Sequence, residues 1–74
     1  MGIRGGVLIT RRNDQESDLA RALLKDREVK FQEIDAEDIR NLRYTPPYLS
    51  VPLSGRLYQG ISAIVYATDI EPSL

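Results

Sequence analysis

The spacing of hydrophobic positions predicts a strand, a helix and a second strand in the first half of the chain. Residues 7–10 form a continuous apolar and β-branched run, which is typical of a strand buried on both faces. Leucines and alanines at helical spacing then predict a helix from about Asp14 to Lys25. A half-buried second strand is indicated by the apolar residues Val29, Phe31 and Ile34. This order predicts a right-handed crossover between two parallel strands.

The start of the predicted helix carries a capping pattern. Asn13 can accept a hydrogen bond from the first helical turn, and Glu16, three residues later, can reach back to the Asn13 backbone. Asp14 and Asp18 suit the positive end of the helix dipole. We therefore expect Asn13 to cap this helix.

In the second half of the chain, the spacing of apolar residues predicts shorter elements. Residues 36–44 hold a single apolar pair, so they support at most one or two helical turns. An antiparallel hairpin is predicted from a third strand at residues 48–51, a turn at 54–55 and a fourth strand at 56–58. Apolar positions at 61–65 then predict a short last helix.

Two consecutive prolines predict a rigid turn that leads into the third strand. In Thr45-Pro46-Pro47, either X-Pro bond can be cis, because that form lies only about 1 kcal/mol above trans. A native cis proline usually marks a tight and specific turn. We expect Pro47 to be cis and Pro46 trans, with Tyr48 as a core or contact aromatic.

The composition excludes several kinds of chemistry. With no Cys and no His in 74 residues, the chain cannot form a disulfide, a zinc finger or a site that uses imidazole as a general base. Ten basic residues nearly balance eleven acidic ones, and a net charge of −1 offers no field for nucleic acid. No apolar run is long enough to span a membrane, and residues 1–4 do not open a signal peptide. We therefore expect one cytoplasmic domain, residues 1–74, without nucleic-acid or membrane contact and without a cofactor.

An acidic stretch offers oxygen ligands for a hard cation. It lacks the glycine and the ligand spacing of a calcium-binding EF-hand loop, so a solvated loop is the favoured interpretation. We expect no metal site at its four residues, Glu33, Asp35, Glu37 and Asp38.

The element order and several short motifs resemble the glutaredoxin and thioredoxin family. Glutaredoxins carry a Thr-Lys pair after the first strand, a Cys-Pro-x-Cys motif at the start of the helix, and a leucine pair within it. When Leu23-Leu24 is matched to that pair, Asp14 and Ser17 fall on the two cysteines, and Thr10-Arg11 falls on Thr-Lys. Downstream, Thr45-Pro46-Pro47 matches the family's Thr-Val-Pro, and Gln59-Gly60 falls near its glycine pair. The resemblance implies a thioredoxin-like (glutaredoxin-type) α/β fold, β-α-β-(short α)-β-β-α, with a four-stranded mixed sheet and a truncated second helix.

Three departures separate the chain from the chemistry of that family. Asp14 and Ser17 supply no thiol, so dithiol redox catalysis is excluded. In the family, the residue before the cis proline pairs through its backbone with a bound peptide, but here that residue is Pro46, which has no N–H. The segment before Thr45 is too short for a full second helix, so one face of the sheet should be thinly covered and either exposed or an interface.

Arginines near the helix start form a candidate anion site. Arg11 and Arg12 precede the helix, and the implied fold brings the loop with Arg43 and Thr45 alongside. By resemblance, Arg11 takes the place of the lysine that meets the glycine carboxylate of glutathione. The favoured alternative is a solvated charge cluster, because surface ion pairs are common. The acidic partners in that cluster would be Asp14, Glu16 or Asp35.

Three hypotheses about function remain. The first, which we favour, is a non-catalytic interaction domain that binds a protein partner or a second copy of itself and has no redox activity. The second is a binder of glutathione or a similar small anion, for which we expect weak or absent binding. The third, an enzyme that uses the carboxylates of Asp14 and Glu16, has little support. The candidate binding residues are Arg11, Arg12, Asp14, Ser17, Arg43, Thr45, Pro46, Pro47, Tyr48, Gln59 and Gly60.

Overall fold

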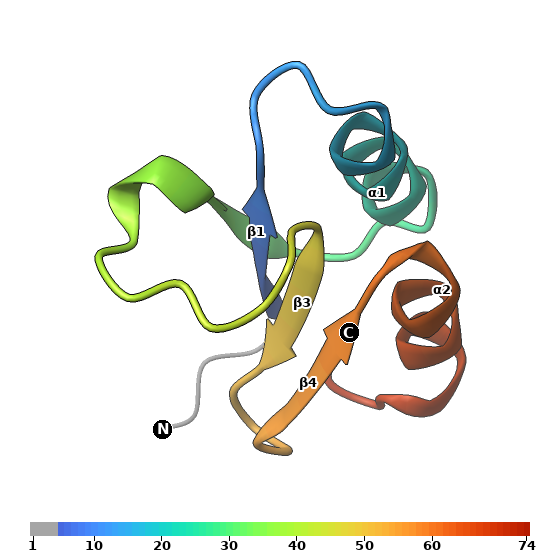
Figure 1. Cartoon of the computed structure of the whole chain (residues 1–74). Helices are drawn as coiled ribbons and strands as arrows, with labels where there is room; N and C mark the ends of the chain where they lie inside the picture. Colours follow the sequence, from blue (N-terminus) through green and yellow to red (C-terminus); the bar gives the residue numbers. More distant parts are fainter. Residues whose placement is uncertain (1–4) are drawn as a thin grey trace.

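The chain is an α/β protein with a four-stranded mixed sheet and two α-helices within the described residues (Figure 1). The computed structural model describes residues 5–74, so the expectation about residues 1–4 lies outside it. The element order is the one expected from the sequence. The elements are β1 (Gly6–Thr10), α1 (Gln15–Asp26), β2 (Phe31–Asp35), the 3-10 turn η1 (Ala36–Asp38), β3 (Tyr48–Val51), β4 (Arg56–Gln59) and α2 (Ile61–Ile70).

The strands lie in the order β2-β1-β3-β4. β1 and β2 are parallel, as the crossover predicts, while β3 is antiparallel to both β1 and β4. Leu8 in β1 is paired with Leu49 in β3, and Leu49 is paired with Tyr58 in β4. These three side chains share one face of the sheet because they are directly opposite one another.

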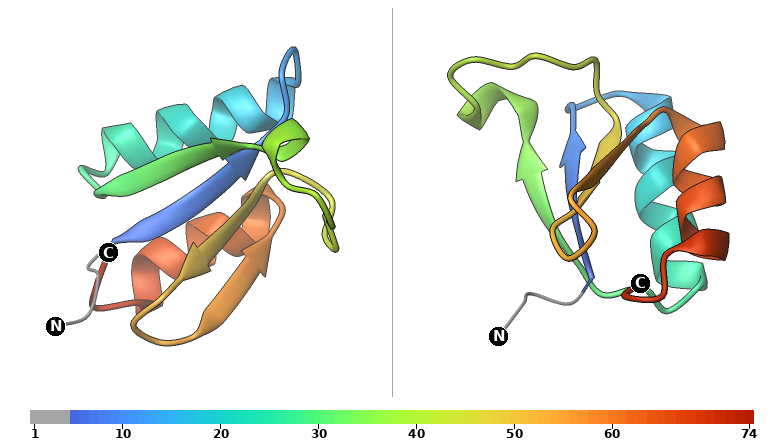
Figure 2. Two further views of the ribbon diagram at one scale, coloured as in Figure 1. Left: turned by 90° about the vertical axis from the view of Figure 1, so that its left-hand side faces the viewer. Right: turned by 90° about the horizontal axis from the view of Figure 1, so that it is seen from below.

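Both α-helices cover that same face (Figure 2, right). The apolar stripe of α1 and the strongly apolar α2 pack against the centre of the sheet, and this removes their side chains from water. The main core therefore lies between the helices and the sheet. Its buried members are Leu8, Ala20, Leu24, Leu49, Val51, Tyr58, Ile64 and Ala67.

The opposite face of the sheet, called the open face below, has much less cover (Figure 2, left). Among residues 5–74 only the connector, residues 36–47, packs on it, and this buries Ile9, Ala36 and Tyr48 in a small second cluster. Leu57 of β4, whose neighbour Tyr58 faces the main core, is 38% exposed. The expectation of one thinly covered face is confirmed. The half-buried residues of this second cluster are Val7, Ile34, Ile39 and Leu42.

Two element boundaries differ by more than one residue from those expected. Val29 precedes β2, which begins at Phe31. The last helix is longer than predicted and continues to Ile70. Its end is held by contacts that no local pattern reveals, because the Arg27 guanidinium donates to the Thr68 hydroxyl at 2.6 Å and lies 3.2 Å from the Asp69 carboxylate.

An ion pair joins α1 to the edge strand β2. The Arg21 guanidinium donates two hydrogen bonds to Glu33, at 2.7 and 2.6 Å, and the Thr10 hydroxyl donates a third at 2.9 Å. The hydrogen bonds from Arg21 are the main cause that lowers the pKa of Glu33 below its ordinary value. Ionised Glu33 is therefore favoured by the folded state.

We predict that this pair makes part of the stability acid-sensitive. Because the pKa of Glu33 is lowered by folding, its contribution is fully present above the ordinary Glu pKa of about 4.3 and is lost as the pH falls through the lower folded value. The difference in unfolding free energy between wild type and Glu33→Gln should shrink over that range in urea titrations. In an Arg21→Gln background, where the Thr10 hydrogen bond to Glu33 remains, the pH dependence of this difference should be much smaller, and a difference that kept its full pH dependence there would contradict this origin.

Candidate functional site

The peptide bond between Pro46 and Pro47 is cis, as expected, and both rings are buried. The Pro47 carbonyl accepts a hydrogen bond of 2.9 Å from the backbone N–H of Gly60, which is the residue that caps α2 with a φ of 88°. Glycine suits this position because other residues seldom adopt positive φ. The loop before β3 is thereby joined to the start of α2, and Tyr48 follows as a buried core aromatic.

The capping residue of α1 is Asp14, so the expectation for Asn13 is wrong by one position. Asn13 instead has a φ of 55°, which turns the chain before the helix. The Asp14 carboxylate accepts hydrogen bonds from the Ser17 backbone N–H at 3.2 Å and from the Ser17 hydroxyl at 2.7 Å. Asn and Asp are about equally good caps, so the position of Ser17, three residues after Asp14, decides which of the two residues caps the helix.

Ser17 is fully buried and makes a second contact that fixes the loop before α1. Its hydroxyl oxygen accepts a hydrogen bond of 3.0 Å from the Arg11 backbone N–H. Ser17 thus connects the end of β1 to the capped start of the helix. The two residues matched by resemblance to the glutaredoxin cysteines are in direct contact, but they form a structural cap and have no thiol.

This cap places a negative charge where an incoming anion would bind. The N-terminal N–H groups of a helix attract anions, but the Asp14 carboxylate already accepts from one of them and would repel a second negative group. Glu16, the other carboxylate considered for catalysis, is exposed and makes no side-chain hydrogen bond within residues 5–74. Among the described residues the Asp14 carboxylate is thus occupied as a helix cap, and the Glu16 carboxylate has no side-chain partner.

The arginines of the candidate anion site have different surroundings. Arg12 forms an ion pair of 2.9 Å with Asp35, as in the solvated charge cluster considered above, and its own side chain remains 77% exposed. Arg11, Arg43 and Thr45 are exposed, and none of their side chains makes an ion pair or hydrogen bond with another described residue. Gln59 is also exposed, one residue before Gly60. The structure thus brings together Asp14, Ser17 and the Arg11 backbone, and separately Pro47 and Gly60.

The acidic stretch around β2 is not arranged as a metal site. Glu33 and Asp35 are each held by an arginine, and Asp35 also accepts from the Glu37 backbone N–H at 2.9 Å. Within residues 5–74 no group of three or more acidic side chains is placed to hold a metal ion.

A buried carboxylate in the C-terminal segment had no signal in the sequence pattern. Glu71 ends α2, and its side chain is 2% exposed. The carboxylate accepts hydrogen bonds from the Tyr58 hydroxyl and, at 2.9 Å, from the Ser54 hydroxyl. Its hydrogen bond with Tyr58 is the main cause that raises the pKa of that tyrosine.

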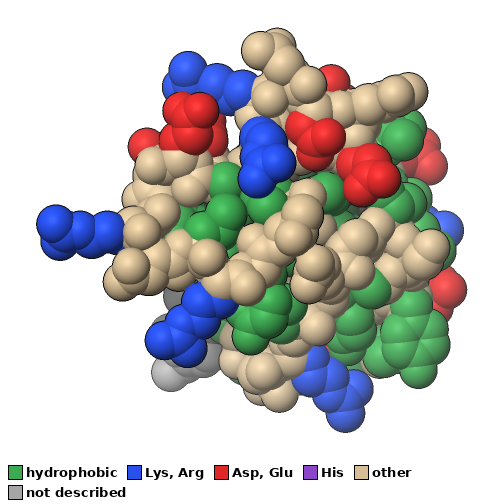
Figure 3. All heavy atoms as spheres, in the orientation of Figure 1, with side chains coloured by type: hydrophobic (Ala, Val, Ile, Leu, Met, Phe, Trp, Pro, Cys, Tyr) green, Lys and Arg blue, Asp and Glu red, His purple; other side chains and the backbone are tan. Residues whose placement is uncertain are grey.

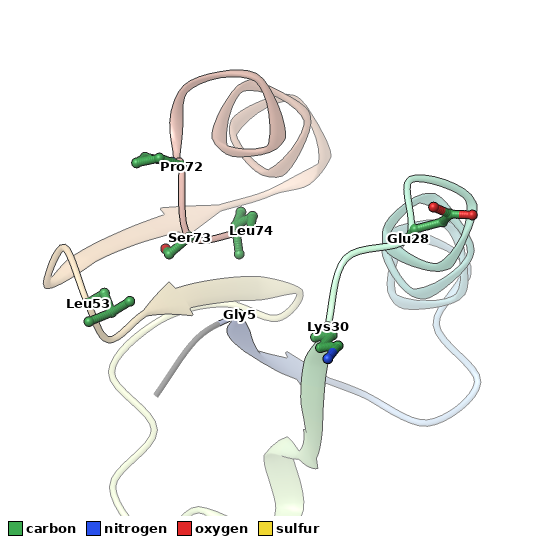
Figure 4. A pocket seen from close by; sticks show the side chains of 7 residues that line it. All are labelled: Gly5, Glu28, Lys30, Leu53, Pro72, Ser73 and Leu74. Atoms are coloured by element: carbon green, nitrogen blue, oxygen red, sulfur yellow. The ribbon is translucent and has the colours of Figure 1, made fainter. Parts of the chain in front are cut away.

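A hollow of about 500 Å³ lies at the opposite end of β1 from the proline loop (Figure 4). Its walls come from the loop before β2, the turn between β3 and β4, and the C-terminal segment. Glu28 and Lys30 are its charged lining residues among those described. The other lining residues are Gly5, Leu53, Pro72, Ser73 and Leu74.

Comparisons with known proteins give no relative on which a function could be based. No family model, no curated protein and no solved structure matches the chain. Neither helix within residues 5–74 has the length and apolar character needed to cross a bilayer. The geometry of the chain's own residues is therefore the basis for its assignment.

We predict that a disulfide forms readily in the double variant Asp14→Cys/Ser17→Cys. The two native side chains meet at 2.7 Å, and a disulfide needs Cα atoms within about 4.4 to 6.8 Å of each other. Free-thiol titration and intact mass after air oxidation measure the bond. In the control Asp14→Cys/Asp18→Cys, the second thiol moves one residue along the helix to an exposed position, and oxidation should be slower. A folded Asp14→Cys/Ser17→Cys variant that kept both thiols would show that this part of the fold is wrong.

Proposed function

We propose that the chain is a non-catalytic interaction domain with a thioredoxin-like fold, which binds a protein partner or a second copy of itself. The strand order β2-β1-β3-β4, with β1 and β2 parallel, supports this fold. A cis proline directly before β3 and the cap of α1 at the matched cysteine positions support it further. The absence of Cys removes the redox chemistry of that fold.

The observation that carries the proposal is the incomplete cover of the open face. The connector buries the part of the face nearest to it, but Leu57 and Tyr44 remain 38% and 45% exposed, and Val7 is only half-buried. Figure 3 has the orientation of Figure 1, in which the open face is turned to the left, and it shows apolar side chains at the surface at several places of the molecule. Exposed apolar area beside polar residues is typical of a surface that another protein covers.

The second candidate function, binding of a small anion such as glutathione, rests on Arg11 and Arg43, which are exposed and have no ion pair among the described residues. Two features disfavour it. The Asp14 carboxylate occupies the helix start, and Pro46 offers no backbone N–H to a bound peptide. The interaction domain is therefore the better supported of the two.

Affinity capture from the cell of origin tests the proposal when it includes surface variants. We expect wild type and the control Leu19→Glu, on the exposed side of α1, to retain the same partner, whether another protein or another copy of the chain. The double variant Tyr44→Glu/Leu57→Glu should lose it while remaining folded by circular dichroism. Equal capture by all three forms would overturn the proposal that the open face is the binding surface.

A further inference from the structure

Four charged side chains of the connector have no partner within the described residues. Glu37 and Asp38 come first along the chain, and Arg40 and Arg43 follow. All four are exposed, and none makes an ion pair with residues 5–74. The other arginines within residues 5–74 differ from them, because all but Arg11 pair with a carboxylate. Those paired arginines are Arg12, Arg21, Arg27 and Arg56.

These four charges border an apolar surface. Ile39 and Leu42 lie between them in the sequence and pack on the open face. Tyr44, directly after Arg43, is 45% exposed and stacks edge-on against Tyr48 with ring centres 5.4 Å apart. The connector therefore presents acidic groups, basic groups and an aromatic ring beside the uncovered part of the sheet.

We infer that the occupant of this surface is a second copy of the chain, related by a two-fold axis. In such an interface each surface meets its own equivalent, so Glu37 and Asp38 of one copy can face Arg40 and Arg43 of the other, and the reverse. A patch with both signs of charge complements itself in this way. The net charge of −1 adds little repulsion between copies. This inference rests on the proposed function and names its partner.

The size of the molecule indicates that the interface extends beyond the connector. A standard stable interface covers about 800 Å² on each partner, which is roughly a sixth of the 5172 Å² of accessible surface here. With principal extents of 29 × 24 × 16 Å, that area needs most of one face. Leu57 and Val7 on the open face would then contribute the apolar centre, with the connector charges at the rim.

Charge reversal with sedimentation equilibrium tests this arrangement. We expect wild type to dimerise reversibly at micromolar to millimolar concentration. Arg40→Glu/Arg43→Glu makes the connector entirely acidic, and Glu37→Lys/Asp38→Lys makes it entirely basic. Each variant alone should associate at least about tenfold more weakly, whereas an equimolar mixture should form a heterodimer at least as stable as the wild-type dimer. Rising salt should weaken the heterodimer.

Matched controls separate this effect from that of net charge. Lys25→Glu/Lys30→Glu and Asp26→Lys/Glu28→Lys change the net charge by the same amounts but lie at the far end of α1 and in the loop after it, so they should dimerise like wild type. The inference would be overturned by a monomeric wild type or by controls that dissociate as readily as the connector variants. It would also be overturned if the equimolar mixture of the two connector variants stayed monomeric. The proposed function fails separately, when capture of a partner does not depend on Tyr44 and Leu57.

Discussion

Replacing Leu49 by Ala is expected to lower the free energy of unfolding by about 3 kcal/mol. Leu49 is fully buried at the centre of the sheet, where it is paired with Leu8 on one side and Tyr58 on the other. Truncation removes apolar contacts on the face that both helices cover, and it leaves a cavity that the sheet cannot close without moving its neighbours. Urea unfolding followed by circular dichroism measures the loss.

A leucine two residues beyond β3 provides the control for this variant. Leu53 is 51% exposed in the turn between β3 and β4, so Leu53→Ala should change stability by no more than about 0.5 kcal/mol. A small domain has only about 5 to 10 kcal/mol of stability, and Leu49→Ala should therefore be visibly less stable to heat. Equal effects of the two truncations would contradict the position of the core.

Removing the buried carboxylate in Glu71→Ala is expected to lower the unfolding free energy by about 2 to 3 kcal/mol. The Tyr58 hydroxyl then loses its acceptor while the ring remains buried, and the Ser54 hydroxyl loses one of its contacts. Glu71→Gln keeps an oxygen acceptor in place and should lose less. Urea titrations of both variants provide the comparison.

An exposed acid serves as the reference for the Glu71 variants. Asp26 ends α1 without an ion pair among the described residues, and Asp26→Ala should be within about 0.5 kcal/mol of wild type. Tyr58 provides an independent readout, because its pKa should return toward the ordinary tyrosine value in Glu71→Ala. An unchanged Tyr58 titration would show that the two groups do not interact in solution.

Hydrophobic periodicity was sufficient to predict the order of the elements. The strand, helix, strand and hairpin follow from local spacing, because each element must bury its apolar side against the same sheet. The ends of the elements were harder to predict, because they depend on contacts with residues that are distant in the chain. The end of α2 is held by Arg27, and these contacts span about forty residues, a separation over which no local pattern extends.

The candidate site was predictable only in part for the same reason. The proline loop and the thinly covered face follow from chain order and from the length of the connector. The capping residue was misjudged because Asn13 and Asp14 are both good caps, and only the position of Ser17 decides between them. Asp35, the partner of Arg12, was only one of three candidates. The burial of Glu71 was not predicted, because it depends on the hairpin that packs against the short C-terminal segment.

The most direct test of the central claim is a chemical-shift titration of the native protein with glutathione, with phosphate as a second anion. The claim is that the chain binds another protein and not a small ligand. We predict a dissociation constant for glutathione of about a millimolar or weaker. The chain has no thiolate for a mixed disulfide, Pro46 has no N–H, and the Asp14 carboxylate occupies the helix start. The exposed arginines should compensate little for these missing contacts, because a solvated charge pair contributes only about 1 kcal/mol or less to binding. Saturable micromolar binding that maps to Arg11, Arg12 and Thr45 and disappears in Arg11→Ala would contradict the account.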